Sequence, residues 1–400
     1  MTAAALATRA NSHASAARRS LQLDLFRGVA AIFMIVNHAG YQLLGAGAVG
    51  DDWPTWLVFV GSAAPALFFF ATGVGSGLGA GRGEAWASAA RKVVLLLLAD
   101  ALLNWSTGTV LGFDFFGFAA VATATLFAVR RARHPARVAA VLLVLVVAAR
   151  FGLAPVARGW IEDDTLLAFV TGIAGVHHVS YPLGPWLAFP LLGFLVGRLW
   201  QQGPSSHEGW TVGGVGGLCL ALSGLLAAHG APVFRWGSVS IAYFLCAGGI
   251  VATAWLCADR VAAAWPPLAR WLSLRGPASL LIVPLHYGIL GGLEALLPPP
   301  WDPVPWAPAT FALASVVFLL SRALVSNARR LPVPGRIMQG AVAAAALAVG
   351  WVALRGWPPL ARLEACSAGQ VAIALLLLWS SNKKSALARR AGAGPKADDR

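Results

Sequence analysis

The sequence is short of charge, and of acidic charge above all. Only 12% of its 400 residues are charged, with 16 acidic against 30 basic side chains, whereas 58% are hydrophobic. A chain of this composition has too little polar surface to cover a soluble fold. Its polar stretches are also too short to form a separate soluble domain. The sequence therefore predicts an integral membrane protein.

Cysteine is scarce as well, and the motifs of the common soluble chemistries are missing. Cys219, Cys246, Cys257 and Cys366 all fall inside or beside apolar segments, where cysteine behaves as a small hydrophobe. We expect no disulfide framework, no CxxC metal site and no redox role. The sequence contains no Walker loop, no HExxH zinc motif and no GxSxG elbow, so no metal is predicted.

Long apolar runs fill the chain instead, each with about the 17–25 residues that cross a bilayer as a helix. They predict an all-α, polytopic integral membrane protein with about 10–12 transmembrane helices. Residues 1–21 are predicted as a cytoplasmic N-terminal tail, 22–381 as a single transmembrane domain, and 382–400 as a basic cytoplasmic C-terminal tail. The predicted spans are 22–44, 55–79, 90–110, 113–131, 137–156, 185–201, 210–229, 238–258, 276–296, 305–325, 336–355 and 367–381.

Basic residues gather on one side of this predicted topology. With the N-terminus inside, 24 of the 30 fall in cytoplasmic segments, as the positive-inside rule demands. This bias explains the net charge of +14 without nucleic acid as a partner. The outer side holds only Arg150, Arg158, Arg235, Arg355 and Arg362. Alanine-rich, lysine-poor usage indicates a GC-rich bacterial genome, so we expect a multi-pass protein of the inner (plasma) membrane with both termini cytoplasmic.

Glycine and tryptophan patterns indicate how the spans pack. The pairs Gly73 with Gly77 and Gly193 with Gly197 have the GxxxG spacing of closely packed helices. Six of the 17 tryptophans lie at span ends and predict an interfacial belt. These are Trp53, Trp56, Trp186, Trp200, Trp301 and Trp306. Whether the chain forms a homodimer stays open.

The first predicted span carries ionisable groups at both ends. Arg27 and His38 are eleven residues apart, almost three helical turns, so both point the same way about 16 Å apart along one face. Asp24 lies one turn before Arg27 and can pair with it. Ionisable groups inside a membrane are costly, which favours a function for them. In the alternative, Arg27 snorkels to lipid phosphates and His38 lies in the outer headgroup layer.

Two later spans carry polar groups near mid-membrane. His286 lies about ten residues into its span, with Ser279 two turns earlier on the same face and Pro284 able to open the helix between them. Asp100 and Asn104 lie one turn apart in another span, and Asp100 should meet a cation or be protonated. A packing role for His286, and a clasp between helices for Asp100, remain alternatives.

The connections beside these spans also carry polar groups. Asp114, between two phenylalanines at the start of its span, is predicted to be a helix cap. The longest outer loop, 157–184, includes an apolar piece at 165–176 and ends near His177 and His178. It is either an ordinary exposed loop or a segment that lies over a site.

Four stretches of sequence resemble a family of transmembrane acyltransferases. Residues 23–28, followed by an apolar run to His38, resemble the first helix of such enzymes, where an Arg and a His are separated by ten residues. Residues 65–73 are similar to a "PLFLFLxG" helix and 181–198 to a "PLxPWxxxxLLGxxxGR" helix. Residues 276–286 resemble the "GxxSLxxYxxH" helix shared with acyltransferases of type three, although its Tyr is missing. In this order they resemble the heparan-α-glucosaminide N-acetyltransferase catalytic-domain family.

This resemblance implies transfer of an acetyl or other acyl group from cytoplasmic acyl-CoA to a hydroxyl or amine of a cell-envelope glycan or glycolipid. Acyl-CoA is then the donor substrate. It implies that Arg27, with Asp24 and Ser279, binds the donor, because arginine offers paired donors to phosphate. His38 would act as the base or carry the acyl group itself. His286 and Asp100 would orient that base or stabilise the oxyanion.

Two other classes of function stay open at this stage. Many spans with intramembrane Asp and His also suit a proton-coupled secondary transporter, although residues 81–83 lack the charged signature of the largest twelve-span carrier family. A non-enzymatic scaffold or lipid-binding protein is the third class. Uptake of a substrate without acyl-CoA would indicate the transporter. A cellular role that persists when both His38 and His286 are substituted would indicate the scaffold.

Overall fold

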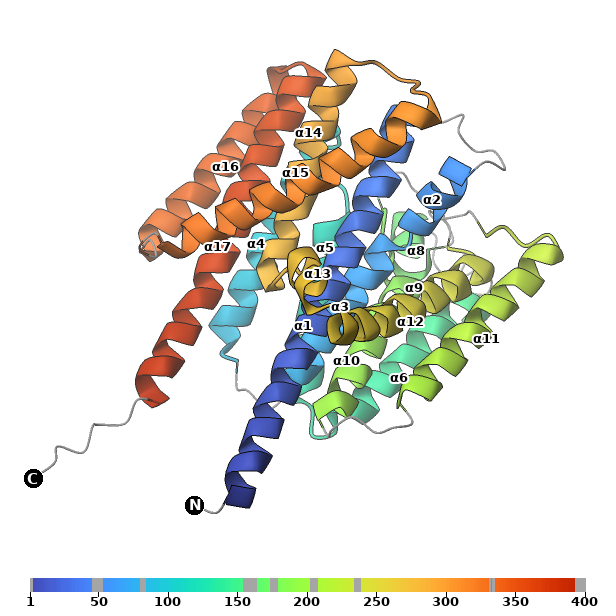
Figure 1. Ribbon diagram of the computed structural model, residues 1–400. Coiled ribbons are helices and arrows are strands. Elements are labelled where there is room, and N and C mark those ends of the chain that lie inside the picture. The colour runs from blue at the N-terminus through green and yellow to red at the C-terminus, as the bar shows by residue number, and fades with distance from the viewer. Residues whose placement is uncertain are drawn as a thin grey trace, which may run out of the picture.

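The computed structural model describes residues 3–44, 53–79, 84–153, 164–172, 179–201, 208–233, 239–330, 332 and 335–392. Within these ranges every regular element is a helix, so the predicted all-α class is confirmed. Figure 1 shows the helices side by side, with both termini extending from the same end. The elements are α1 (Ala3–Ala39), η1 (Gly40–Leu44), α2 (Trp53–Gly61), α3 (Ala64–Leu78), α4 (Trp86–Ser106), α5 (Phe115–Arg131), α6 (Pro135–Ala148), η2 (Ala149–Leu153), α8 (Asp164–Thr171), α9 (Leu183–Trp186), α10 (Ala188–Gln201), α11 (Glu208–Ala228), α12 (Ile241–Ala264), α13 (Pro266–Leu272), η3 (Gly276–Leu281), α14 (Ile282–Leu296), α15 (Pro303–Arg330), α16 (Arg336–Gly356) and α17 (Pro359–Gly392).

Ten stretches of the described chain are long and apolar enough to cross a membrane, which confirms the predicted number. Each of the twelve segments predicted as spans is helical over most of its described residues. The two outside the ten are α4, which carries Arg91, Lys92 and Asp100, and α5, which has only 17 residues. Two helices run further than predicted, since α1 begins at Ala3 and α17 continues to Gly392.

Close packing of α3 against α10 confirms the prediction made from the glycine spacing. A Cβ atom at Gly73 would collide with the backbone of Pro190, and one at Gly193 with the backbone of Phe70. Gly77 and Gly197 lie just as closely against the opposite helix. Only glycine allows two helix backbones to approach this closely, so α3 and α10 form a rigid centre for the bundle.

Helix α1 crosses the bundle beside this pair and carries polar groups at both of its membrane ends. It packs against α2, α3, α12 and α13. Phe26 lies in an aromatic cluster with Phe70 of α3 and Trp255 of α12, with ring centroids 5.6 Å and 5.2 Å away. Gly28 lets the carbonyl of Leu272 approach where a Cβ atom would otherwise be. The position of α1 is therefore set by its neighbours along its whole membrane segment.

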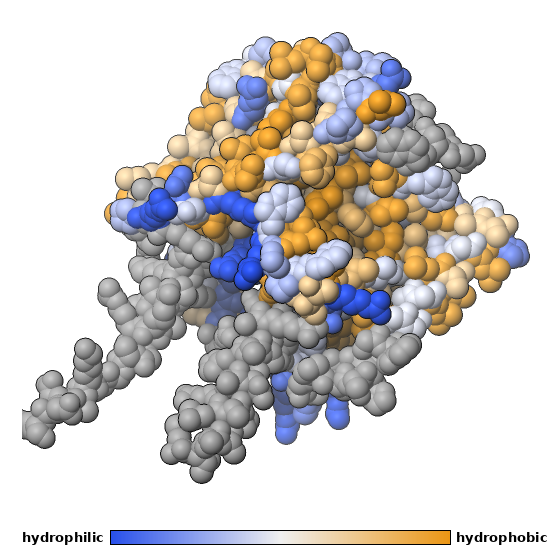
Figure 2. Space-filling model, viewed as in Figure 1, coloured by the Kyte–Doolittle hydropathy of each residue, from blue (hydrophilic) through white to orange (hydrophobic). Residues whose placement is uncertain are grey.

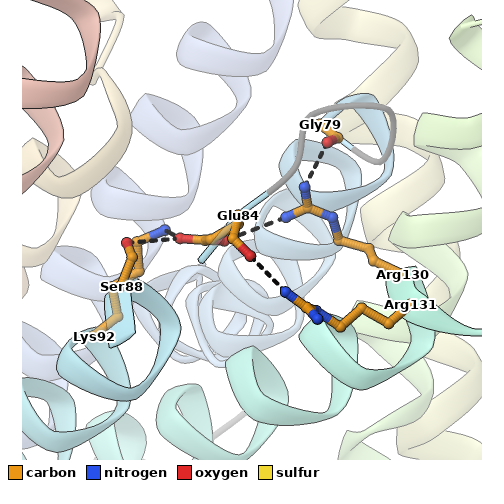
Figure 3. Close-up of polar contacts among 6 residues, drawn as sticks. All are labelled: Gly79, Glu84, Ser88, Lys92, Arg130 and Arg131. Carbon is orange, nitrogen blue, oxygen red and sulfur yellow. Dashed lines mark hydrogen bonds and ion pairs between the residues drawn. The ribbon is translucent and has the colours of Figure 1, made fainter. Parts of the chain in front are cut away.

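A network around Glu84 holds two connections together at the end of the bundle where the chain termini lie. Figure 3 shows this carboxylate between Lys92 of α4 and Arg130 of α5, at 2.7 Å and 3.4 Å, while Arg131 donates to the Glu84 backbone carbonyl. Arg130 also donates to the carbonyl of Gly79. The α3–α4 and α5–α6 connections therefore share one face, as the predicted topology requires.

The prediction of a tryptophan belt is wrong for half of its six members. Trp186, Trp306 and Trp200 are core residues, exposed by only 0%, 1% and 8%. Trp186 packs edge-on against Phe69 and Tyr181 in the aromatic core. Position at a span end does not tell whether a side chain faces lipid or another helix. The side chain of Trp53 lies outside the described residues.

Candidate functional site

The two histidines predicted from separate spans meet in the folded chain. Nδ1 of His38, near the end of α1, lies 2.6 Å from Nε2 of His286 on α14. His286 is fully buried, whereas His38 is partly buried. Both side chains face protein neighbours, so the headgroup alternative for His38 does not hold. The imidazoles form a pair inside the bundle, 248 residues apart in the chain.

The hydrogen bonds of this pair determine where its protons lie. Nδ1 of His286 is 2.6 Å from the carbonyl oxygen of Ile282, which only accepts, so this nitrogen carries a hydrogen. In a neutral His286 the Nε2 atom is then an acceptor, and it receives the Nδ1 hydrogen of His38. The Nε2 atom of His38 is left with a free lone pair. The pair therefore presents one basic nitrogen.

Tyr287 faces that basic nitrogen. Its hydroxyl lies 3.3 Å from Nε2 of His38, and the two rings are 4.7 Å apart. A bond of this length is weaker than the 2.6 Å contact between the histidines, so a substrate hydroxyl or amine could replace it. Tyr287 is not among the residues predicted from the sequence, although its place next to His286 and its phenol group were a usable signal.

Local backbone structure positions these side chains. The α-helical part of α1 ends at Ala39, one residue after His38, and the π-helical turn η1 follows. On the opposite side, the 3₁₀ turn η3 changes to α14 at Ile282, just before Pro284. Irregular turns of this kind are common at functional sites in membrane helices. The predicted opening at Pro284 thus appears as a change of helix type.

A second polar cluster, around Asp114 and Asp100, lies where α5 begins. Asp114 caps α5 by accepting from the Phe115 N–H, as predicted, and it also accepts from the Ser180 hydroxyl at 2.9 Å. Burial and the charge of Asp114 hold the pKa of Tyr181 well above its usual value.

The loop at 157–184 contributes to this cluster. Ser180 and Tyr181 come from its end, and the Ser180 N–H donates to the carbonyl of Phe113. Phe169 of α8, in the apolar piece of the loop, packs edge-on against Phe113 at 4.8 Å. This part of the loop therefore packs beside the polar cluster. His177 and His178 lie outside the described residues.

Asp100 has no cation among its described partners, contrary to one of the two predicted alternatives. Its Oδ2 atom accepts from the Asn104 amide at 3.2 Å and from the Asp114 N–H at 3.3 Å. Its buried Oδ1 atom has no hydrogen-bond partner in the part of the chain that the structure describes. The hydrogen bond from the Asp114 backbone places Asp100 beside that residue. Among the described residues, no hydrogen bond joins Asp100 to either histidine.

Two of the three residues predicted to bind the donor, Asp24 and Arg27, lie at the other end of the membrane segment Leu21–Leu44 that α1 and η1 form. Arg27 donates to Asp24 at 2.9 Å, as predicted, and its guanidinium also lies against Gly75 of α3. Ser279 donates to the carbonyl of Gly276 within η3, so its hydroxyl caps its own turn. The structure therefore brings Asp24 and Arg27 together and leaves Ser279 apart from both them and the histidines.

These observations define a polytopic membrane protein in which two histidines, one from its first helix and one from a late helix, are in contact. The chain belongs to the heparan-alpha-glucosaminide N-acetyltransferase catalytic family, whose model matches residues 19–223, just over half of the sequence. It is therefore a member of a family of membrane acetyltransferases. No curated protein and no solved structure matches it. His38 lies inside the matched segment, whereas His286 and Tyr287 lie beyond it.

Proposed function

We propose that the protein transfers an acetyl or other acyl group from cytoplasmic acyl-CoA to a hydroxyl or amine of a cell-envelope glycan or glycolipid. The observation that carries this proposal is the direction of the hydrogen bonds from Ile282 through His286 to His38. It leaves a neutral imidazole with its lone pair free. Such a group is suited to accept a proton from an attacking nucleophile.

The proposed reaction balances with these groups. The acceptor oxygen or nitrogen bonds to the thioester carbonyl carbon while its proton moves to Nε2 of His38. The carbon–sulfur bond then breaks, and the same proton passes from His38 to the departing CoA thiolate. His286 accepts a hydrogen bond from His38 throughout, which stabilises the imidazolium between the two steps.

Tyr287 supplies a donor where negative charge develops. When the acceptor takes its place at Nε2 of His38, the tyrosine hydroxyl is released from its 3.3 Å contact. It can then donate to the carbonyl oxygen as that oxygen becomes negative, the usual role of an oxyanion-hole donor. Transfer by direct attack needs only this set of residues, so an acyl-histidine intermediate is not required.

The proposed orientation places the donor at the Asp24–Arg27 end of α1. That end lies with the arginine-rich connections described above, which we assign to the cytoplasm of a bacterial inner membrane by the positive-inside rule. The histidine pair then lies toward the outer side, where a cell-envelope acceptor arrives. Acyl groups would thus cross most of the bilayer inside the bundle.

A transfer assay with purified protein tests this proposal. In nanodiscs with labelled acetyl-CoA and a membrane glycolipid fraction, wild type should release CoA and label an acceptor. His38→Gln should lower the rate about 10²- to 10⁴-fold, the range for loss of a general base. The matched control is His229→Gln, because His229 is exposed at the end of α11. Equal rates for the two variants would contradict the proposal, as would substrate uptake by proteoliposomes without any acyl-CoA.

A further inference from the structure

A cavity of about 700 Å³ lies between α1, α13 and α15, at the end of the membrane segment Leu21–Leu44 that is opposite the histidine pair. Four arginines line it, together with a single carboxylate, Asp24. Figure 2 shows hydrophilic residues gathered between α13 and the lower end of α15, where the surface is hollowed. The arginines are Arg270, Arg275, Arg322 and Arg330.

Little in the protein neutralises this charge. The shortest ion pair of Asp24 is with Arg27, at 2.9 Å between Oδ1 and Nη1. Its Oδ2 atom lies 3.9 Å from Nε of Arg275. Within the described ranges no carboxylate lies within ion-pair distance of Arg270, Arg322 or Arg330. Arg322 donates only to the backbone carbonyl of Arg270. Unpaired guanidinium groups around a cavity beside a membrane favour an anion as its occupant.

The volume and the number of arginines indicate a ligand with several phosphates. One phosphate takes two parallel hydrogen bonds from one guanidinium, so four arginines suit a ligand with more than one phosphate group. Ser273 and Ser326 add hydroxyl groups to the same wall. In contrast, Arg27 is already paired with Asp24 and does not line the cavity.

The cavity is connected through the chain to the histidine pair. Ala278 of its wall and His286 belong to one continuous η3–α14 segment. At about 2.0 Å per 3₁₀ residue and 1.5 Å per α-helical residue they are roughly 13 Å apart along the axis. A long flexible arm between a phosphorylated head and a thioester can cover a distance of this order.

We infer that this cavity, formed largely by residues 270–330, binds the phosphorylated nucleotide end of the acyl-CoA donor. This inference rests on the proposed function and names a site outside the segment that the family model matches. It assigns the donor phosphates to the four cavity arginines, whereas the family resemblance implied that Arg27 binds the donor. The headgroup of an anionic phospholipid has the same phosphate chemistry, so the test must separate the two sources.

Binding of radiolabelled CoA to protein in nanodiscs of zwitterionic lipid tests the inference, with the fragment 3′,5′-ADP as competitor. The variant Arg322→Gln with Arg330→Gln should weaken both ligands about tenfold or more, the loss expected for charged hydrogen bonds to phosphate. The control is Arg260→Gln, an exposed arginine of α12 that does not line the cavity. Single Arg330→Gln, at the exposed end of α15, is the milder variant should the double one fail to fold.

The outcomes separate this inference from the proposed function. If the double variant binds CoA like wild type, or if the four arginines retain phosphatidylglycerol while CoA does not bind, the cavity is not the donor site. If CoA binding needs the arginines but wild type transfers nothing, the cavity assignment stands and the acyltransferase proposal falls. If wild type transfers the acyl group and the double variant keeps the wild-type donor KM, the acyltransferase proposal stands and the cavity assignment falls.

Discussion

The two ends of the first membrane segment, Leu21–Leu44, hold their ionisable groups in opposite surroundings. At the Asp24–Arg27 end the partners are charged, and a cavity with four more arginines adjoins them. At the His38 end the hydrogen-bond partners are neutral imidazole and phenol groups. A charged end is suited to hold an anion by electrostatic attraction. A neutral, buried end is suited to move a proton, because its base is not already occupied by an acid.

Removing His286 tests the neutral end and should have the largest effect. His286→Phe leaves the Nδ1 hydrogen of His38 without its 2.6 Å acceptor and frees the base to take the wrong tautomer. We expect the transfer rate to fall about 10- to 100-fold, the range for loss of an orienting partner, with CoA affinity unchanged. Steady-state kinetics and CoA binding measure the two separately, and His229→Phe is the control. If only the CoA affinity changed, the assignment of donor binding to the charged end and proton transfer to the neutral end would be contradicted.

Breaking the charged end should affect donor binding instead. Arg27→Gln removes the closest ion-pair partner of Asp24, so its carboxylate competes with the donor phosphates for the cavity arginines, which should weaken CoA binding about tenfold. The rate at saturating donor should stay close to wild type.

A second substitution tells whether Arg27 touches the phosphates. Adding Asp24→Asn removes both charges, so it should restore most of the affinity if Arg27 acts only by neutralising Asp24. If the double variant stays as weak as Arg27→Gln, the guanidinium contacts the donor itself.

Tyr287→Phe should have a smaller effect, again at the neutral end. It removes the hydroxyl that lies 3.3 Å from His38 but keeps the ring packed against the imidazole. Loss of this one oxyanion donor should lower kcat about tenfold, less than the roughly 10²- to 10³-fold usual for such donors, because the contact is long. Tyr243→Phe is a control of the same chemistry, since Tyr243 donates to Ser62 in the aromatic core. Equal losses in the two variants would assign the effect to packing.

Salt provides the mildest test of the contrast. Raising ionic strength from about 0.01 M to 0.15 M shortens the screening length from about 30 Å to 8 Å. The donor KM should rise severalfold because attraction to the arginines weakens, whereas kcat should not change. A kcat that falls with salt while KM is constant would place a charged step at the histidine end.

Sequence patterns predicted the fold well because each signal is local. Apolar length identified every span, and the glycine spacing identified the α3–α10 contact. Tryptophans were the exception, because a span end can face lipid or, as for Trp186, the core. Nothing in local periodicity tells which neighbour a helix end meets.

The polar residues of the candidate site were identified one by one in the sequence, but their arrangement was not. His38 and His286 were each identified from their depth in a span, yet their contact joins segments 248 residues apart. Ser279 shares a face with His286 in sequence, but its hydroxyl is used within its own turn. The cavity arginines were counted only as topology signals, because their convergence depends on how α13 and α15 pack.

A density map of the protein with a non-transferable thioether analogue of acetyl-CoA tests the central claim most directly. The account predicts the phosphates among Arg270, Arg275, Arg322 and Arg330, and the acyl carbonyl carbon beside Nε2 of His38 with Tyr287 turned toward its oxygen. An analogue bound with its acyl group away from the histidine pair would contradict it.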